Sequence, residues 1–373
     1  TKLLQVIPSH TAIQLLKLDD GLDCLRVTRS SDTNAAASTT FTDVAYNQID
    51  ETSAGAISFT SDSGDITLNN AGHYLVLANT GLQKPNVDGR TGYTGQLTLD
   101  GVAVEGSKTT TYMRGNVEAM EVNDGVLSIG MIVQATTGQV LNVEHMKEGG
   151  DNATILATRT ALAVIALPSG ADFIRLEDTS GQNLNDGTWP VAFATQAAPP
   201  DAVFSHSTTT DPSEVTVNAT ESFLFLGAFF SDAIAAQRLS PWQQWRVNGA
   251  VLAYGEAARY SRNDVIFDCG NWSGMMASLE AGDRVEMITQ QLGASGTAAG
   301  DSVGLQGIRI ASLTTSPVLI LNKTLGAYDG IAMTITSNTL KTVDSDTADS
   351  GIVYMLTSAV TGGTLTRNSI TLG

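Results

Sequence analysis

Four blocks of this sequence occur twice, in the same order and about 150 residues apart, and this repeat limits the folds open to the chain. The clearest pair is GQLTLDGVAVEG (Gly95–Gly106) and QQWRVNGAVLAYG (Gln243–Gly255), in which an Asp-Gly or Asn-Gly pair separates two apolar stretches. The other pairs are Val6–Gly21 with Ala166–Gly181, Leu127–Met146 with Trp272–Gln291, and Thr158–Ser169 with Val303–Ser316. Ordered self-similarity of this kind predicts a tandem duplication of one structural unit.

Within each copy, apolar and polar residues alternate with the period of a half-buried β-strand. In ITLNNAGHYLVLANTGL, for example, Ile66 and Leu68 are followed by Tyr74 and Val76 beyond an Asn-Asn-Ala-Gly turn. The Asp-Gly and Asn-Gly pairs tolerate positive φ and favour tight hairpins. No stretch predicts a helix of three turns, so we expect an all-β fold with two tandem jelly-roll β-sandwiches.

Two motifs in these copies resemble those of tumour-necrosis-factor-like jelly rolls, a family that includes complement-type globular heads. One motif is Gly72-His73-Tyr74, and the other is ASLEAGDRVEMIT at Ala277–Thr289, which QATTGQVLNVE in the first copy matches without the Asp. The second copy departs from the first motif at Glu221-Ser222-Phe223. The resemblance implies jelly-roll domains over residues 1–167 and 168–315 that associate as trimers, and it implies no enzyme activity.

From Ser316 the composition changes, and residues 316–373 resemble the start of a chondroitin-sulfate-proteoglycan-type cadherin-like repeat. The matching positions are Asn322, Leu325, Asp329, Gly330, Ile335, Thr336, Leu340, Asp344, Asp346, Tyr354, Thr357, Gly363 and Leu365. The match ends where the family has further strands, so we expect a partial β-sandwich module. Either the polypeptide continues beyond Gly373, which we favour, or a strand of a neighbouring subunit completes the module.

Asp344, Asp346 and Asp349 are the candidate metal ligands of this last module. Alternating carboxylates can supply oxygen ligands to Ca²⁺, and a solvated acidic turn is the alternative interpretation. The four histidines are far apart and show no paired metal spacing, and no Gly-x-Ser-x-Gly motif is present. The sequence therefore predicts no catalytic residues, no enzyme activity, and Ca²⁺ as its one candidate cofactor.

Aromatic residues concentrate in the second copy, and five of them are candidates for an oligomer interface or a glycan contact. They are Phe225, Phe229, Trp242, Trp245 and Trp272. Sugar faces stack on Trp, which favours a carbohydrate platform, whereas FLFLGAFF is apolar at consecutive positions, as in a strand buried on both faces. Core packing or a subunit interface is the interpretation that this pattern favours.

Composition excludes several classes of partner. The formal net charge is −18 and the Lys and Arg residues form no basic run, which argues against nucleic acid. No apolar run reaches the roughly 18 residues of a membrane span, so no membrane insertion is expected. The two cysteines, Cys24 and Cys269, fall in different predicted domains, and we expect buried thiols while a single bridge stays open.

These observations lead to one functional hypothesis and two alternatives. We expect a secreted or surface-displayed structural or adhesive protein that self-assembles through β-sandwich faces into a trimer, filament or matrix, in contact with a glycan or a cell surface. A decoration or fibre protein of a virion is the first alternative, because jelly rolls serve there too. A lectin-like carbohydrate-binding module is the second.

Overall fold

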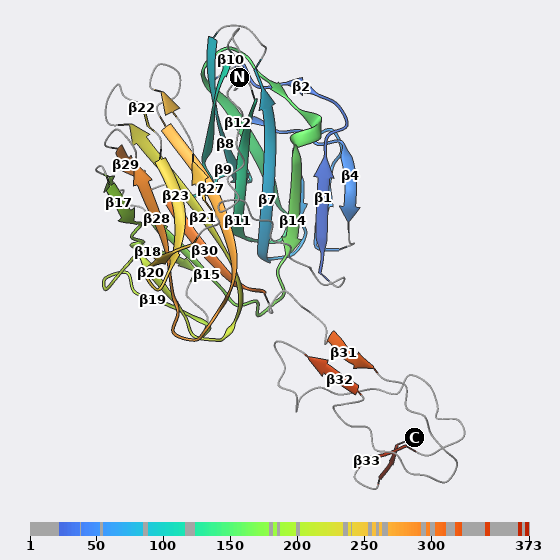
Figure 1. Ribbon diagram of the computed structural model, residues 1–373. Helices are drawn as coiled ribbons and strands as arrows, with labels where there is room; N and C mark the ends of the chain where they lie inside the picture. The colour runs from blue at the N-terminus through green and yellow to red at the C-terminus, as the bar shows by residue number, and fades with distance from the viewer. Residues whose placement is uncertain are drawn as a thin grey trace, which may run out of the picture. The chain divides into compact units, whose positions relative to one another are not determined.

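The computed structural model divides the chain into two compact units, Thr1–Thr315 and Ser316–Gly373. The residues that it describes are 22–37, 39–52, 55–84, 89–115, 124–178, 182–184, 187–198, 202–233, 238–239, 241–252, 256–258, 261–262, 268–291, 296–298, 303–310, 318–322, 340–343, 365–367 and 370–372. Antiparallel strands make up nearly all of the regular structure in these ranges (Figure 1). The prediction of an all-β sandwich protein is therefore confirmed.

The first sandwich consists of two seven-stranded sheets. In sheet A, β4 (Gln48–Thr52), β1 (Cys24–Thr28), β14 (Ala161–Ala166), β7 (Gly72–Gln83) and β11 (Asp124–Ala135) lie side by side, and β13 (Thr154–Ile155) and β2 (Thr33–Asn34) extend the sheet beside the end of β7. Sheet B has the order β10 (Thr109–Gly115), β8 (Gly89–Leu99), β12 (Gln139–Gly150), β6 (Ile66–Leu68) and β5 (Ile57–Phe59). Two short strands, β3 (Thr42–Asp43) and β9 (Val102–Ala103), pair with β12 and β8, and a short 3-10 turn, η2 (Ala157–Arg159), precedes β14. The chain crosses repeatedly between the two sheets, from β7 in sheet A to β8 and β10 in sheet B, back to β11 in sheet A, to β12 in sheet B and to β14 in sheet A, as in a jelly roll.

The second sandwich repeats this strand order. In sheet C, β18 (Thr195–Ala198), β15 (Phe173–Asp178), β30 (Val303–Arg309), β21 (Glu221–Ala233) and β27 (Asp268–Leu279) lie side by side, with β29 (Gly296–Ala298) and β16 (Gln182–Leu184) beside the end of β21. Sheet D has the order β19 (Phe204–His206), β20 (Glu214–Val217), β28 (Arg284–Gln291), β23 (Pro241–Val247) and β24 (Ala250–Val251). Here β17 (Gly187–Pro190) pairs with β28, β25 (Ala257–Ala258) pairs with β23, and β22 (Arg238–Leu239) pairs with β26 (Ser261–Arg262). Each strand of sheets A and B thus has a counterpart at the same place in sheets C and D.

Both sandwiches bury the inward-facing half of an alternating pattern. In the first, Leu25 and Val27 of β1 and Val76 of β7 pack against Leu97 and Val143 of sheet B. In the second, the core contains more aromatic rings: Phe204, Phe223, Phe225, Phe229 and Trp245. Sheet strands with one apolar face fold in this way because each sheet can remove its apolar side chains from water only against another sheet.

The predicted hairpins occur where the sequence places them. Asp100 and Gly101, between β8 and β9, both have positive φ, at 50° and 76°. Asn248 and Gly249, between β23 and β24, have φ of 50° and 80°. Positive φ at both central residues is the requirement of the type I′ turn, which matches the twist of the flanking strands.

The second unit contains two pairs of antiparallel strands among its described residues. β31 (Val318–Asn322) pairs with β32 (Leu340–Val343), and β33 (Leu365–Arg367) pairs with β34 (Ile370–Leu372). Asn322 and Leu340, two positions of the cadherin-like pattern, pair with each other in the first of these strand pairs. Asp344, Asp346 and Asp349 lie outside the described residues.

Candidate functional site: the contact between the two sandwiches

The outer faces of sheets A and C pack against each other through a small apolar cluster, which we call the contact cluster. In β7, Tyr74 and Val76 point into the first core, so Leu75 between them faces outward, and it is nevertheless buried. Its neighbours in the contact cluster are Leu22, Ile132, Ile165, Leu167, Ala171, Phe173 and Ile308, with Cys24, Leu224 and Leu226 packed at the edge. Sheets A and C are therefore buried on both faces where they meet.

Hydrogen bonds also cross this contact. The backbone N–H of Gly270 in β27 donates to Oγ1 of Thr110 in β10 at 2.7 Å. The backbone N–H of Ile132 in β11 donates to Oε1 of Gln306, which reaches across from β30 and is itself buried. A buried amide that lacks a partner costs free energy of folding. These two bonds therefore stabilise the contact and also set the relative position of the strands that form it.

The approach of β10 to β27 requires a residue without a side chain. A Cβ atom on Gly270 would lie 3.0 Å from the Cα of Thr109 and 3.0 Å from the amide nitrogen of Thr110. Nearby, the ammonium group of Lys108 lies 6.0 Å from the ring centre of Phe230, a cation–π distance. These backbone contacts show a fitted surface between the sandwiches.

The structure separates the five aromatic candidates into three environments. Phe225, Phe229 and Trp245 are fully buried in the core of the second sandwich, where the Trp245 Nε1–H donates to Oγ of Ser273 at 3.0 Å. These three side chains therefore pack the interior and present no ring at the surface. A strand that is apolar at consecutive positions is buried on both faces, and this is why FLFLGAFF resembles an interface in sequence.

The remaining two rings lie at surfaces of the sandwich. Trp272 of β27 is half-buried and packs against the core of the first sandwich, so it belongs to the contact between the two sandwiches. Trp242 of β23 is half-buried on the outer side of sheet D, in the alternating row that also contains Gln244 and Arg246. A subunit or ligand contact through these five residues was predicted from the concentration of aromatic residues in the second copy, and it stays a prediction.

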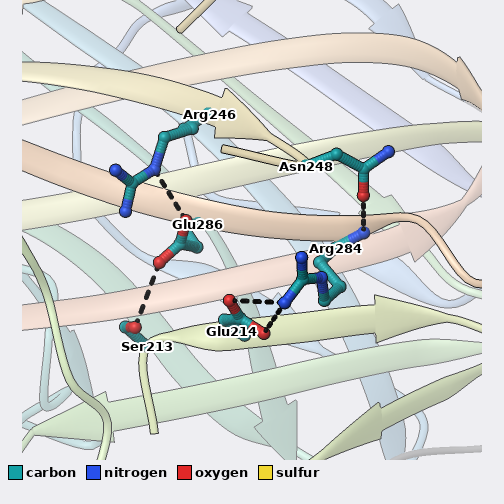
Figure 2. A network of polar contacts seen from close by, with 6 residues as sticks. All are labelled: Ser213, Glu214, Arg246, Asn248, Arg284 and Glu286. Carbon is teal, nitrogen blue, oxygen red and sulfur yellow. Dashed lines mark hydrogen bonds and ion pairs between the residues drawn. The ribbon is translucent and has the colours of Figure 1, made fainter. Parts of the chain in front are cut away.

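The outer face of sheet D has a network of charged side chains (Figure 2). Glu286 of β28 accepts from Nε of Arg246 at 2.7 Å and from the hydroxyl of Ser213 at 3.2 Å. On the same strand, Arg284 donates to both carboxylate oxygens of Glu214, at 3.1 and 3.2 Å. Each carboxylate is paired with a guanidinium, so the network ties β20, β23 and β28 together.

The outer face of sheet B is acidic, in contrast. Asp43 of β3 lies opposite Glu144 of β12, and burial together with the charges of Glu144 and Asp65 raises the pKa of Asp43. The side-chain amides of Gln96 and Asn142 donate to Glu144 and Asp65, at 2.8 and 2.9 Å. Among the described residues, no group of three or more His, Cys, Asp or Glu is arranged to hold a metal ion.

Behind this acidic face, His145 is buried in the first sandwich. It is 2% exposed, and its Nε2 accepts a hydrogen bond from the backbone N–H of Ala36 at 2.8 Å. Because Nε2 is the acceptor, the neutral ring carries its proton on Nδ1. Burial lowers the pKa of His145 to about 4, and the charge of Arg29 acts in the same direction, while a backbone interaction with Thr42 opposes the shift.

A small cavity of about 290 Å³ lies at one end of the first sandwich. Asp23, His73 and Tyr74 contribute polar atoms to its lining. Two of these groups make bonds to the backbone, since Oδ2 of Asp23 accepts from the N–H of Ala56 at 3.0 Å and the Tyr74 hydroxyl donates to the carbonyl of Asn70 at 2.7 Å. The cavity is at the small end of the range for ligand pockets.

Runs of consecutive apolar residues in two strands of sheet A indicate the contact cluster, whereas alternation of apolar and polar residues does not. YLVLA at Tyr74–Ala78 and MIV at Met131–Val133 are apolar at consecutive positions, which is typical of strands covered on both faces. His145 had no such signal, because its burial depends on the segment around Ala36, which is 109 residues away in sequence.

Comparison with known proteins gives no family for the chain. No protein-family model matches it, and no curated protein matches it. Among solved structures, murine APRIL at pH 5.0 is similar with a TM-score of 0.28 and 11% identity, over 39% of this chain and 99% of that chain. Eiger TNF from S. frugiperda is similar with a TM-score of 0.30 and 13% identity, over 40% of this chain and 96% of that chain. The fold assignment rests on the strand order and the cores described above.

Among the described residues, no helix is long and apolar enough to cross a membrane.

Proposed function

We propose that this is a non-enzymatic structural protein that assembles with copies of itself through β-sandwich faces, outside the cell or on its surface. The observation that carries this proposal is the contact cluster, in which the outer faces of sheets A and C bury Leu75, Ile132 and Ile308. An outer sheet face that packs against a sandwich of the same chain can pack in the same way against a sandwich of another copy. Extracellular display rests on the sequence resemblance described above.

The proposal extends to the duplication of the sandwiches and to the last module of the chain. The repeated strand order supports a tandem duplication that produced jelly rolls over residues 1–167 and 168–315. Residues 316–373 form a cadherin-like module in this proposal, with Asp344, Asp346 and Asp349 as calcium ligands near its junction with the next module. Calcium would then stiffen the chain rather than take part in any reaction.

Electron microscopy of the purified native protein tests the proposal directly. We expect particles or filaments that contain several chains, and the number of subunits around the axis gives the symmetry. If calcium stiffens the module, chelation shortens or disperses the filaments. Monomeric particles at every protein concentration and calcium level would overturn self-assembly as the function.

A carbohydrate-binding role is a second candidate, and the outer side of sheet D favours it. Trp242 lies there in one row with Gln244 and Arg246, so that an aromatic face adjoins amide and guanidinium donors. Trp245 takes no part, because it is buried. Retention on a glycan array that is lost in Trp242→Ala and kept in Trp189→Ala, at an exposed ring of edge strand β17, would support this role; no retention, or equal loss in both variants, would exclude it.

A further inference from the structure

The sequence contains a single Asn-Gly pair, Asn248 and Gly249, and this pair forms the turn between β23 and β24. Asn-Gly is the pair at which an unfolded chain deamidates most readily. The glycine has no Cβ to hinder the approach of its backbone nitrogen to the asparagine side chain, and asparagine is among the thermolabile residues. Asn248 is exposed, so burial does not protect it. Its reactivity therefore depends on how the folded turn holds its side chain.

Both polar atoms of the Asn248 amide are bonded to the segment at the start of β28. Oδ1 accepts from the backbone N–H of Arg284 at 3.0 Å, as Figure 2 shows. Nδ2 donates to Oδ1 of Asp283 at 2.7 Å, and Oδ2 of Asp283 accepts from the backbone N–H of Glu280 at 2.8 Å. The bonds from Asn248 and Glu280 lower the pKa of Asp283, so this carboxylate is ionised at neutral pH and fixed in position.

The equivalent turn of the first sandwich has the same bonds with the two groups exchanged. Asp100 accepts from the backbone N–H of Val140 at 2.9 Å and from the side-chain amide of Gln139 at 3.1 Å. The other end of the Gln139 amide, Oε1, accepts from the backbone N–H of Thr136 at 2.8 Å. In each turn, therefore, an amide faces a carboxylate, and the acidic turn residue of the first sandwich has an amide as its partner.

We propose that Asn248 is a latent deamidation site, which its bond to Asp283 keeps inactive while the turn between β23 and β24 is closed. When the turn opens, the backbone nitrogen of Gly249 attacks the side-chain amide carbon of Asn248. The new N–C bond closes a succinimide ring and the bond from that carbon to Nδ2 breaks, so the amide group leaves as ammonia with the proton of the Gly249 nitrogen. Water then opens the ring at either carbonyl, which gives aspartate or isoaspartate at position 248.

The closed turn opposes this reaction for a geometric reason. Ring closure needs the Gly249 nitrogen to lie over the amide carbon of Asn248, and this requires rotation of the backbone and the side chain of Asn248. The bonds to Arg284 and Asp283 hold the amide against β28, so they must break before that rotation. After the reaction, a carboxylate stands where Nδ2 donated to Asp283, and repulsion between the two like charges prevents the turn from closing in its original form.

Peptide mapping of the full chain during incubation at mildly alkaline pH tests this site. Trypsin cleaves after Arg246 and releases a peptide that contains the turn, and mass spectrometry of this peptide gives the deamidated fraction with time. We expect the folded chain to deamidate about 100-fold more slowly than the same chain in urea, because two hydrogen bonds must first break. Asp283→Ala removes one of these bonds, so it should raise the rate in the folded chain by about tenfold.

Two control variants separate the bond to Asn248 from a general loosening of β28. Asp283→Asn keeps a side-chain oxygen that can accept from Asn248, and it should deamidate at nearly the wild-type rate. Glu214→Ala removes a carboxylate that is bonded to the guanidinium of Arg284 and leaves the Asn248 amide untouched, so its rate should also be that of the wild type. Equal rates in the folded and the unfolded chain would overturn the proposal, as would equal acceleration by Asp283→Ala and Glu214→Ala.

A second measurement tests the consequence of the reaction and does not depend on the folding of Asp283→Ala. Asn248→Asp places two carboxylates opposite each other, so we expect a lower midpoint in urea titrations. The double variant Asn248→Asp/Asp283→Gln reproduces the pair of Asp100 and Gln139, and it should recover the wild-type midpoint. An unchanged midpoint for the single variant, or no recovery in the double variant, would overturn the inferred effect of deamidation on the turn.

Discussion

Acidification from about pH 7 to about pH 4 should lower the free energy of unfolding of the first sandwich, because His145 is held neutral in the folded protein. The folded protein holds this imidazole neutral, with a pKa of about 4 against 6.5 for an unperturbed histidine. A proton on Nε2 would oppose the N–H of Ala36, which donates to that nitrogen at 2.8 Å, and would place a cation in a site that is 2% exposed.

The size and the direction of the effect follow from proton linkage. The unfolded chain binds a proton at His145 near its ordinary pKa, and the folded chain does so only near the lowered one. The contribution is therefore fully present above about pH 6.5 and is lost progressively as the pH falls to about 4. A difference of about 2.5 pKa units corresponds to about 3 kcal/mol.

The assay is chemical denaturation followed by circular dichroism at a series of pH values, in the wild type and in His145→Gln. The glutamine does not titrate, and its amide oxygen can accept the Ala36 N–H. We expect the wild type to lose about 3 kcal/mol more than the variant across this range, because carboxylate contributions common to both proteins cancel. His206→Gln is the matched control, at a less buried histidine whose pKa is lowered by burial. This variant keeps His145, so its free energy of unfolding should fall on acidification nearly as much as that of the wild type. Parallel stability curves for the wild type and His145→Gln would refute the reasoning.

Two further predictions concern packing. Asp151→Asn removes a carboxylate that lies 2.9 Å from the fully buried Lys84 ammonium, so we expect the free energy of unfolding to fall by about 1.5–3 kcal/mol in urea titrations, and an unchanged midpoint would contradict this. Gly227→Ala places a Cβ 2.6 Å from the sulfur of Met287 and 2.8 Å from Nε2 of Gln243, and overpacking of this kind should lower the thermal midpoint by an amount equivalent to about 1–3 kcal/mol; a variant as stable as the wild type would show that this core can relax.

Local features of the fold could be predicted because local chemistry determines them. An Asp-Gly or Asn-Gly pair reaches positive φ at low cost, so the turns at Asp100 and Asn248 form wherever two strands flank them. Strand period two is likewise a property of a few neighbouring residues, and it identifies Leu25 and Val27 as inward-facing without any knowledge of the opposite sheet.

Features that depend on distant segments could not be predicted in the same way. Phe225 and Trp245 have the composition of an interface, and only the opposition of sheets C and D shows that they fill a core, where their ring centres are 6.1 Å apart. The buried state of His145 depends on Ala36, and the outward burial of Leu75 depends on a sandwich that begins about 100 residues later. Sequence periodicity reports which residues share a face, but not what covers that face.

The two sandwiches differ at one pair of equivalent positions beside the contact cluster. Leu77 pairs with Ala163 in sheet A, whereas Leu226 pairs with Gln306 in sheet C. The longer side chain of Gln306 in the second sandwich accepts a hydrogen bond from the backbone N–H of Ile132 in the first. At this position, therefore, a side chain of sheet C bonds to the backbone of sheet A. The first sandwich has Ala163 at the same place, and the next residues across sheet A in that row are Arg26 and Glu51. Alanine has no side-chain acceptor, so sheet A cannot make the equivalent bond from Ala163 to sheet C, and this pair of residues accounts for the difference between the two sides of the contact.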